Sequence, residues 1–302
     1  MAPTKKGHKN AEKKLGLAEV LSSLPLFDDL YLRMQAMNLE IVDGFLQDQE
    51  RALLREYLEL ERTPIPSMVF VSALSQLWVF GIYELLRTWR QRVGKVLTFV
   101  YGLRKVRPEN RRQFIEQQRT TVQKASQHAL ISRWGDFARA AKHPRFVCDL
   151  EQAFDNSELV FRRIESLRIS LAKHEIPKSK GAFALAPGYA RLDEITGSIL
   201  WQFVLEGNEV DAVTRREIAK ECLGLAEDHS DHILPRTVQP KLDVIPKYSY
   251  ALRRVTVVLK DGTSFSGVSV AYCKFIVRVE GHPNRCPFDA RDVVDVSYEA
   301  AT

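Results

Sequence analysis

A positively charged segment between residues 86 and 120 is the first part of the chain whose residue types could do chemistry. Arginine forks match phosphate oxygens, and aromatic rings placed among them give bases a surface to stack on. Only Glu109 and Glu116 oppose the positive charges. The segment therefore predicts contact with nucleic acid; a solvated helix face whose arginines pair with acids of a helical bundle is the alternative. The positive residues are Arg87, Arg90, Arg92, Lys95, Arg104, Lys105, Arg107, Arg111, Arg112 and Arg119, and the aromatic residues are Trp89, Phe99, Tyr101 and Phe114.

A second candidate site lies near the end of a later helical segment. Ile164, Leu167, Leu171 and His174 follow one another at spacings of three and four residues, so His174 ends an apolar seam close to a helix C-terminus. A histidine in such a place can bond to the last carbonyl groups, and the helix dipole favours its cationic form. A purely structural role is therefore one interpretation of His174.

The other interpretation comes from a resemblance. Arg168 and His174, with five residues between them, resemble the Arg-x(4–6)-His element of HEPN-type helical domains. The resemblance implies an all-helical body and a metal-independent ribonuclease that is active at a dimer interface. In that chemistry His174 would act as acid or base on the 2′-hydroxyl or the leaving oxygen, and Arg168 would stabilise the charge on the phosphorane. Ile169 stands where that family usually has a polar residue.

The composition is ordinary for a globular protein and excludes wholesale disorder. Hydrophobic residues make up 45% of the 302 residues, and 44 Lys and Arg against 38 Asp and Glu give a net charge of +6, which favours an anionic partner. The chain has no Gly-rich phosphate loop, no H-E-x-x-H and no G-x-S-x-G, so nucleotide hydrolysis, zinc proteolysis and esterase chemistry are not supported. The four cysteines include no C-x-x-C pair. No metal or other cofactor is expected.

The same sequence bears on location. The basic N-terminal stretch is not followed by an uninterrupted apolar run, as a secretory signal would be. The most apolar run, residues 68–83, is shorter than the roughly 20 residues that a membrane span needs, and it is interpreted as a buried helix in the centre of a bundle. We therefore expect a cytoplasmic protein that does not associate with membranes.

Helical periodicity dominates the first 226 residues. Asp28 and Asp29 are predicted to cap a long helix that Pro64 and Pro66 end. Thr214 and Glu217 form a capping box for a later helix. The expected helices cover residues 28–61, 67–97, 108–128, 129–142, 144–175 with a break near 155–157, and 214–225. Residues 198–205 are expected to form a strand, with a helix as the alternative, since Ile195, Ile199 and Phe203 also fit helical spacing.

The last 53 residues change to the two-residue period of strands. Val255, Val257 and Leu259 alternate with polar neighbours before a hairpin turn at Asp261 and Gly262. Five short strands are expected, including one at 286–288 and one at 292–298, and they predict a small closed barrel. The predicted fold is mainly α, an N-terminal multi-helix bundle with a C-terminal five-stranded small β-barrel. Its parts are a basic disordered tail at 1–18, an α-helical domain at 19–226, a linker at 227–249 and the barrel at 250–302.

The barrel sequence resembles the Sm-like small barrels of RNA chaperones. The resemblance lies in a strand, an xDG turn, a strand ending in Gly267, a third apolar strand and a valine-rich last strand. That family carries a short basic, aromatic and histidine motif before the last strand, where this chain has the acidic run 288–292. The alternative is a barrel, of the general SH3-like kind, that docks on its own helical domain or on another subunit.

Two functions follow from these patterns. The first is an RNA-associated cytoplasmic protein, in its specific form a HEPN-like metal-independent endoribonuclease of the toxin or defence type. In it Arg168 and His174 would be catalytic, and the positive residues from Arg87 to Arg119 would hold RNA. The second is a non-catalytic assembly protein whose helices bind a partner and whose barrel docks or oligomerises. Expected partners are RNA and either a second copy of the chain or another protein.

Overall fold

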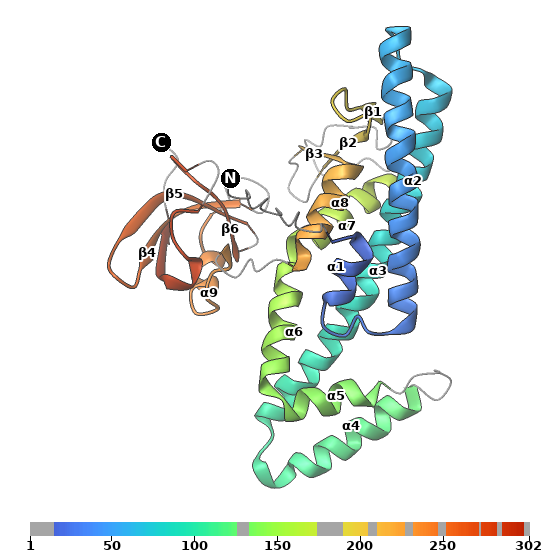
Figure 1. Ribbon diagram of the computed structural model, residues 1–302. Helices are drawn as coiled ribbons and strands as arrows, with labels where there is room; N and C mark the ends of the chain where they lie inside the picture. The colour runs from blue at the N-terminus through green and yellow to red at the C-terminus, as the bar shows by residue number, and fades with distance from the viewer. Residues whose placement is uncertain are drawn as a thin grey trace, which may run out of the picture.

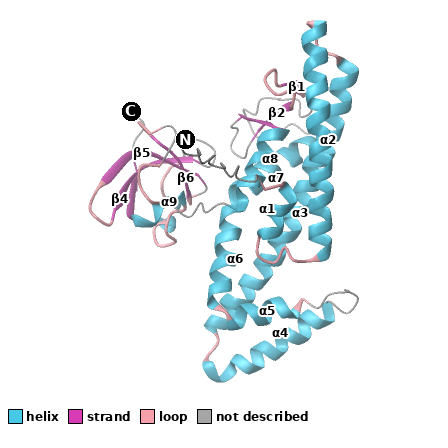
Figure 2. Cartoon of the chain, viewed as in Figure 1, coloured by secondary structure: helices cyan, strands magenta, loops and turns pink. Residues whose placement is uncertain are grey.

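A computed structural model describes residues 15–125, 133–173, 190–204, 210–226, 232–246, 252–271, 273–282 and 286–298. The chain is mainly helical, with a body of long helices and a small β unit beside it (Figures 1 and 2). The described helices are α1 (Leu17–Ser23), α2 (Leu30–Leu60), α3 (Ile65–Lys105), α4 (Arg111–Ala125), α5 (Trp134–Lys142), α6 (Pro144–Asn156), α7 (Glu158–Lys173), α8 (Arg215–Leu223) and α9 (Gln239–Asp243). A mainly α-helical fold is therefore confirmed.

Several predicted helix ends are confirmed, because the residues that cap or interrupt a helix interact with residues only a few positions away. The Asp29 carboxylate caps α2 by accepting a hydrogen bond from the Tyr31 N–H at 2.8 Å. The helix expected over 144–175 is broken at Ser157, which separates α6 from α7. Thr214 and Glu217 form the predicted capping box of α8, with the Thr214 N–H donating to the Glu217 carboxylate at 2.7 Å.

The longest helix, α3, is the centre of the helical body over its middle and its second half. Trp78, Ile82, Leu86, Trp89 and Val93 are buried, and α2, α5, α6 and α7 pack around this stretch. The expectation that the apolar first half lies centrally holds for one side of the helix only: Val71, Trp78 and Val79 are buried, whereas the opposite side is exposed. The exposed side chains there are Ile65, Val69, Phe70 and Leu77. By length and composition alone α3 is also a helix that could cross a membrane, a criterion that core helices meet as well.

A small antiparallel sheet follows the helices, with the strand order β1 (Arg191–Leu192), β2 (Ile199–Val204), β3 (Val210–Thr214). The strand expected over 198–205 is thus confirmed as β2. Its inward side chains Ile199, Trp201 and Phe203 are buried in the same core as the helices. Gly197, just before β2, has a φ of +74°, and a Cβ there would lie 2.1 Å from the Glu50 carbonyl oxygen. The turn before β2 therefore approaches α2 more closely than a side chain would allow.

A buried ion cluster joins α2 to this sheet and to α8. Glu50 and Arg215 are both fully buried, and Glu50 accepts hydrogen bonds from Arg215 Nε at 2.6 Å, Arg216 Nε at 2.6 Å and Ser198 Oγ at 2.9 Å. Arg215 also donates to Asp43. Burial alone would raise the pKa of Glu50, but the hydrogen bonds and charge of Arg215, with the bonds from Arg216 and Ser198, outweigh it and hold the pKa below its usual value.

The C-terminal β unit is a four-stranded antiparallel sheet with the order β6-β5-β4-β7. Its strands are β4 (Leu252–Leu259), β5 (Ser264–Ala271), β6 (Phe275–Val279) and β7 (Val293–Tyr298). The predicted hairpin turn is present, and Gly262 there has a φ of +85°. The predicted five-stranded closed barrel is wrong for the described residues, in which β6 and β7 remain the two edges. Residues 286–288 form no strand, because Pro287 has no N–H to donate and Asp289 caps a short 3-10 turn by accepting from the Arg291 N–H.

Residues 232–246 cover the sheet where the missing strand would have closed it. Leu234, Val238, Leu242 and Ile245 are buried in the core of the β unit. The Leu234 N–H donates to the Lys274 carbonyl at 2.9 Å, and Ile233 forms a β-bridge with Phe275. The described part of the segment expected to be a linker is therefore packed against the sheet.

The β unit is tied to the helical body by ion pairs around one carboxylate. Asp155 of α6 accepts from Lys274 Nζ at 2.6 Å and lies 3.9 Å from an Arg236 nitrogen. Arg236 also donates to the Tyr101 hydroxyl at 3.3 Å. Both Asp155 and Lys274 are largely buried, so this contact is better shielded from solvent than a surface ion pair.

The buried ion cluster makes a testable prediction about stability. Glu50→Gln removes the charge that balances Arg215 and should lower the free energy of unfolding by about 3 kcal/mol in urea denaturation. Glu59→Gln, at an exposed position of the same helix, should change it by less than about 0.5 kcal/mol.

The difference should also depend on pH. Because folding lowers the pKa of Glu50, its contribution is fully present above its usual value of 4.5 and is lost as the pH falls through the folded pKa. The gap between wild type and Glu50→Gln should therefore narrow on acidification. A gap that stays constant or widens would contradict the assignment of Glu50 as a buried carboxylate.

Candidate functional site

The positive segment predicted to bind nucleic acid divides into a paired part and an exposed part. Arg90 and Arg92, both on the buried stretch of α3, are paired inside the helical body. Arg90 donates to the Phe154 carbonyl at 2.7 Å and to the Glu158 carboxylate at 3.0 Å. Arg92 lies 2.8 Å from Asp136 and 3.2 Å from Asp29. These arginines hold helices together, as the alternative interpretation of the segment expects.

The remaining positions are more available. Arg87 pairs with Glu84 one turn away, in a half-exposed position. Lys95 is exposed on α3. The other predicted residues are exposed at the end of the helical body where α3 meets α4 and α5. We call this surface the basic end; it consists of Arg104, Lys105, Arg107, Arg111, Arg112 and Arg119, together with Lys142 of α5.

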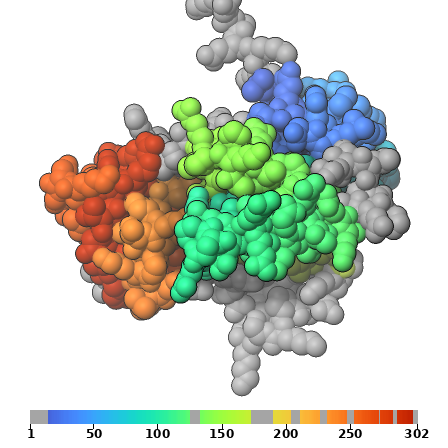
Figure 3. Space-filling model, turned by 90° about the horizontal axis from the view of Figure 1, so that it is seen from below, coloured from blue at the N-terminus to red at the C-terminus, as the bar shows by residue number. Residues whose placement is uncertain are grey.

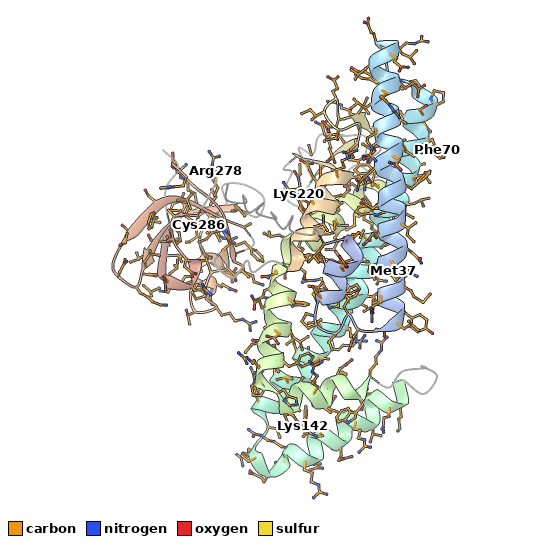
Figure 4. All side chains as sticks on the ribbon, viewed as in Figure 1. Met37, Phe70, Lys142, Lys220, Arg278 and Cys286 are labelled. Carbon is orange, nitrogen blue, oxygen red and sulfur yellow. The ribbon has the colours of Figure 1, made fainter. Side chains whose placement is uncertain are left out.

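Figure 3 looks onto this part of the molecule, where α4 and α5 cover the face in teal and green beside the orange and red β unit. Lys142 lies at the same end in Figure 4. Ion pairing in the basic end is weak: Arg104 lies 4.0 Å from Glu151, and Arg119 lies 3.9 Å from Glu116. Within the described part of the chain, Lys105, Arg107, Arg112 and Lys142 form no ion pair. The positive charge of the basic end is therefore largely uncompensated.

A cleft of about 510 Å³ opens in the middle of the basic end, between α3, α4, α5 and the start of α6. Its floor is apolar and its rim is positive. Phosphate oxygens fit the rim, because arginine offers several donors in a fixed plane, and a ring of a base fits an apolar floor. The floor includes Phe99, Val100, Leu103, Ile115, Trp134 and Val147, and the rim includes Arg104, Arg111, Arg119 and Lys142 with one acid, Glu116.

The aromatic residues predicted to stack on bases are mostly structural. Trp89 is buried, and its indole N–H donates to the Pro25 carbonyl at 2.8 Å. Phe99 packs against Phe114, with ring centres 5.9 Å apart. The Tyr101 hydroxyl donates to Glu151 at 2.6 Å. These rings position α3, α4 and α6, and of the four only Phe99 also lines the cleft.

Trp134 is the aromatic side chain that sequence reasoning missed. It is partly exposed, lines the cleft, and lies 6.0 Å from Phe99 in an edge-to-face arrangement. The sequence could have indicated Trp134, because it begins the short amphipathic helix α5, which ends at Lys142. The helix spacing alone does not say that α5 folds back against α4.

The candidate catalytic pair lies elsewhere. The Arg168 guanidinium on α7 stands 5.1 Å from the centre of the Tyr83 ring on α3. His174 lies outside the described residues. Tyr83 and Arg104 are 21 positions apart on α3, which at 1.5 Å per residue is about 30 Å. The structure therefore does not bring Arg168 close to the basic end of the same chain.

A second cleft, of about 670 Å³, lies between α7, α8 and strand β6. Its charged groups are largely engaged with one another: Arg163 donates to Asp211 at 2.7 Å and also to Glu221. Burial raises the pKa of Glu221, although Arg163 opposes that change. Lys220 lies on the same side of α8, toward the β unit (Figure 4). Because Arg163 is already paired with Asp211 and Glu221, this cleft has less uncompensated positive charge for an anionic ligand than the basic end has.

In comparisons with known proteins, no family model, no curated sequence and no solved structure matches this chain.

The division of the arginines gives a direct prediction. Arg92→Ala removes the partner of two mostly buried carboxylates, Asp29 and Asp136, and should lower the free energy of unfolding by about 3 kcal/mol. Arg112→Ala, at an exposed position of α4, should change it by less than about 0.5 kcal/mol. Urea denaturation of both variants measures the difference. Equal losses would show that the two arginines do not differ in structural role.

Proposed function

We propose that this protein binds single-stranded RNA through the basic end. The observation that carries the proposal is a cluster of exposed, largely unpaired positive side chains around a cleft with an apolar floor. Phosphate contacts supply most of the affinity in such binding, and stacking in apolar pockets requires bases that are not paired in a duplex. A duplex would present its phosphates to the rim but no base to the floor.

The charge distribution supports an anionic ligand at this place rather than elsewhere. Other arginines of the helical body, such as Arg163 and Arg215, are held by carboxylates at short distance. At the basic end the nearest carboxylates, Glu116 and Glu151, lie at the limit of ion pairing. A positive surface of this kind also speeds the approach of a polyanion.

The ribonuclease stays a separate prediction. It rests on the resemblance of Arg168 and His174 to the HEPN-type element, and Tyr83, beside which Arg168 lies, is about 30 Å from Arg104 along α3. Binding of RNA at the basic end therefore does not by itself bring a scissile bond to Arg168. The Sm-like character of the β unit, the cytoplasmic location and the absence of a cofactor likewise remain predictions.

A second candidate function, that of an assembly protein, is favoured by a different observation. The α2–α3 hairpin carries an exposed apolar face on the side away from the β unit. A large apolar surface that stays exposed to water usually marks an interaction site. The two functions use different surfaces and are compatible with each other.

The test of RNA binding compares two variants of equal net charge. Arg104→Ala, Arg111→Ala and Arg119→Ala together should weaken binding of a labelled single-stranded RNA pool at least tenfold, and should reduce the salt slope by about 2, since each lost phosphate contact removes roughly 0.7. The control replaces three exposed arginines elsewhere, Arg55, Arg62 and Arg278, by alanine and should bind almost as wild type.

Two outcomes would contradict the proposal: no salt-dependent binding by wild type, or equal loss in both triple variants. Incubation of the same labelled RNA with the protein in EDTA, followed by analysis of RNA length, tests the predicted ribonuclease activity. Cleavage by wild type that His174→Ala loses while binding is retained would support it. Binding without cleavage would exclude the ribonuclease under those conditions and leave the RNA-binding proposal intact.

A further inference from the structure

Helix α2 carries two apolar stripes on opposite sides. One stripe, which includes Leu32, Leu39, Leu46 and Leu53, is buried in the helical body. The other points to solvent, and each of its side chains is between 47% and 70% exposed. It consists of Leu30, Met34, Met37, Ile41 and Phe45. A surface helix of a globular protein needs only one apolar stripe, so the second stripe is not explained by the fold of this chain.

Helix α3 also carries exposed apolar side chains, at the level of the exposed stripe and beyond it. The Trp78 indole N–H donates to the Leu39 carbonyl at 3.0 Å, so Leu77 next to it is level with the middle of the α2 stripe. Val69 and Phe70 extend the apolar surface toward the 61–64 connection, where α2 and α3 reach beyond the other helices (Figure 1). Figure 4 shows Met37 and Phe70 on the outer side of the hairpin. We call this surface the outer face of the α2–α3 hairpin.

The size of the outer face is that of a stable interface. Its side chains together expose on the order of 1,000 Å² of surface, whereas a standard protein interface buries roughly 800 Å² on each partner. The largest apolar patch of a typical monomer is about 300–600 Å². The outer face therefore exceeds what a protein usually leaves in contact with water.

The spacing of the stripe points to a helix as its partner. Leu30, Met34, Met37 and Ile41 follow one another at intervals of four, three and four residues, and the next position in that series is Gly44. This is the heptad spacing of helices that pack side by side. A Cβ on Gly44 would meet nothing within 4 Å in this chain, so no contact inside the molecule requires a glycine there. A glycine within a helix destabilises it, but it lets a second helix approach closely.

The charges near the outer face argue against a lipid surface. Helix α2 contains three arginines and no lysine, and of its six acidic residues Asp43 and Glu50 belong to the buried ion cluster. Amphipathic helices that lie on anionic membranes are instead rich in Lys and Arg on their polar side. The partner that fits this face is therefore a protein helix.

We propose that the outer face binds the outer face of a second copy of this chain, with the two α2 helices antiparallel about a two-fold axis near Met37. In that register Met37 meets Met37 of the second copy, Met34 meets Ile41, and Leu30 lies over Gly44 and Phe45. The Met37 contact lies on the axis and occurs once, and each of the other contacts occurs twice, as a two-fold interface requires. The large residue at one end of the stripe fills the space that Gly44 leaves at the other.

The arrangement has a consequence for the basic end. Arg92 links Asp29, the cap of α2, to Asp136 of α5, so the helix that carries Lys142 of the basic end is tied to the N-terminal end of α2. Antiparallel α2 helices therefore carry the two basic ends at opposite ends of the dimer. The proposed dimer does not depend on RNA binding, and either can fail without the other.

Analytical ultracentrifugation of the full chain over a range of concentrations tests the proposal. Wild type should be a dimer at micromolar concentration, and Met37→Glu with Ile41→Glu should dissociate at least tenfold more readily. Both side chains are exposed in the single chain, so circular dichroism should show unchanged helix content. Val244→Glu, at an exposed apolar position of the β unit, is the matched control and should dimerise as wild type.

Gly44→Ala separates the dimer from a folding effect. The substitution favours the α2 helix and should raise the stability of the monomer, yet it places a methyl group where Leu30 of the second copy would lie and should weaken the dimer. A monomeric wild type, or a dimer that the Met37 and Ile41 variant leaves intact, would overturn the proposal. Binding of wild type to phosphatidylcholine and phosphatidylglycerol vesicles that this variant loses would overturn it in favour of a membrane surface.

Discussion

The length of α3 is the constraint on which the rest of the structure depends. At 41 residues it spans about 60 Å, and the helices packed against it cover only its middle and second half. One end is therefore left with α2 as its main cover and exposes apolar side chains. The other end reaches into the angle between α4 and α5 and exposes arginines. A single long helix thus separates an apolar surface from a positive one.

Ion pairs between distant parts of the sequence fix the elements around α3. Arg92 joins α3 to the start of α2 and to α5, and Glu50 with Arg215 joins α2 to α8. Asp155 with Lys274 holds the β unit against α6. These charges are buried and paired, so removing one partner leaves the other charge buried and unbalanced. The resulting loss of folding stability is larger than the stability that the pair adds compared with apolar residues in its place. The arginines that remain outside such pairs are the ones available to a ligand.

The sequence is informative where the cause is local. The break at Ser157, the capping box at Thr214 and the turn at Gly262 depend on residues a few positions apart, and each is present. The sequence is uninformative where the cause is a distant partner. Nothing near Arg90 in the chain indicates that Glu158 neutralises it, and periodicity shows which residues share a face but not what covers that face. That the C-terminal sheet stays open was not predictable for the same reason, since residues 232–246 cover it in place of a fifth strand.

The candidate site was predictable in part for the same reason. The exposed arginines of α3 and α4 follow from charge density, whereas Trp134 and Lys142 join them only because α5 folds back on α4.

The central claim is that RNA lies in the cleft between these helices. Ultraviolet cross-linking of bound single-stranded RNA, followed by peptide mass spectrometry, tests it most directly. We predict cross-linked peptides from residues 99–119 and 134–142; cross-links confined to the β unit or to the α2–α3 hairpin would contradict the claim.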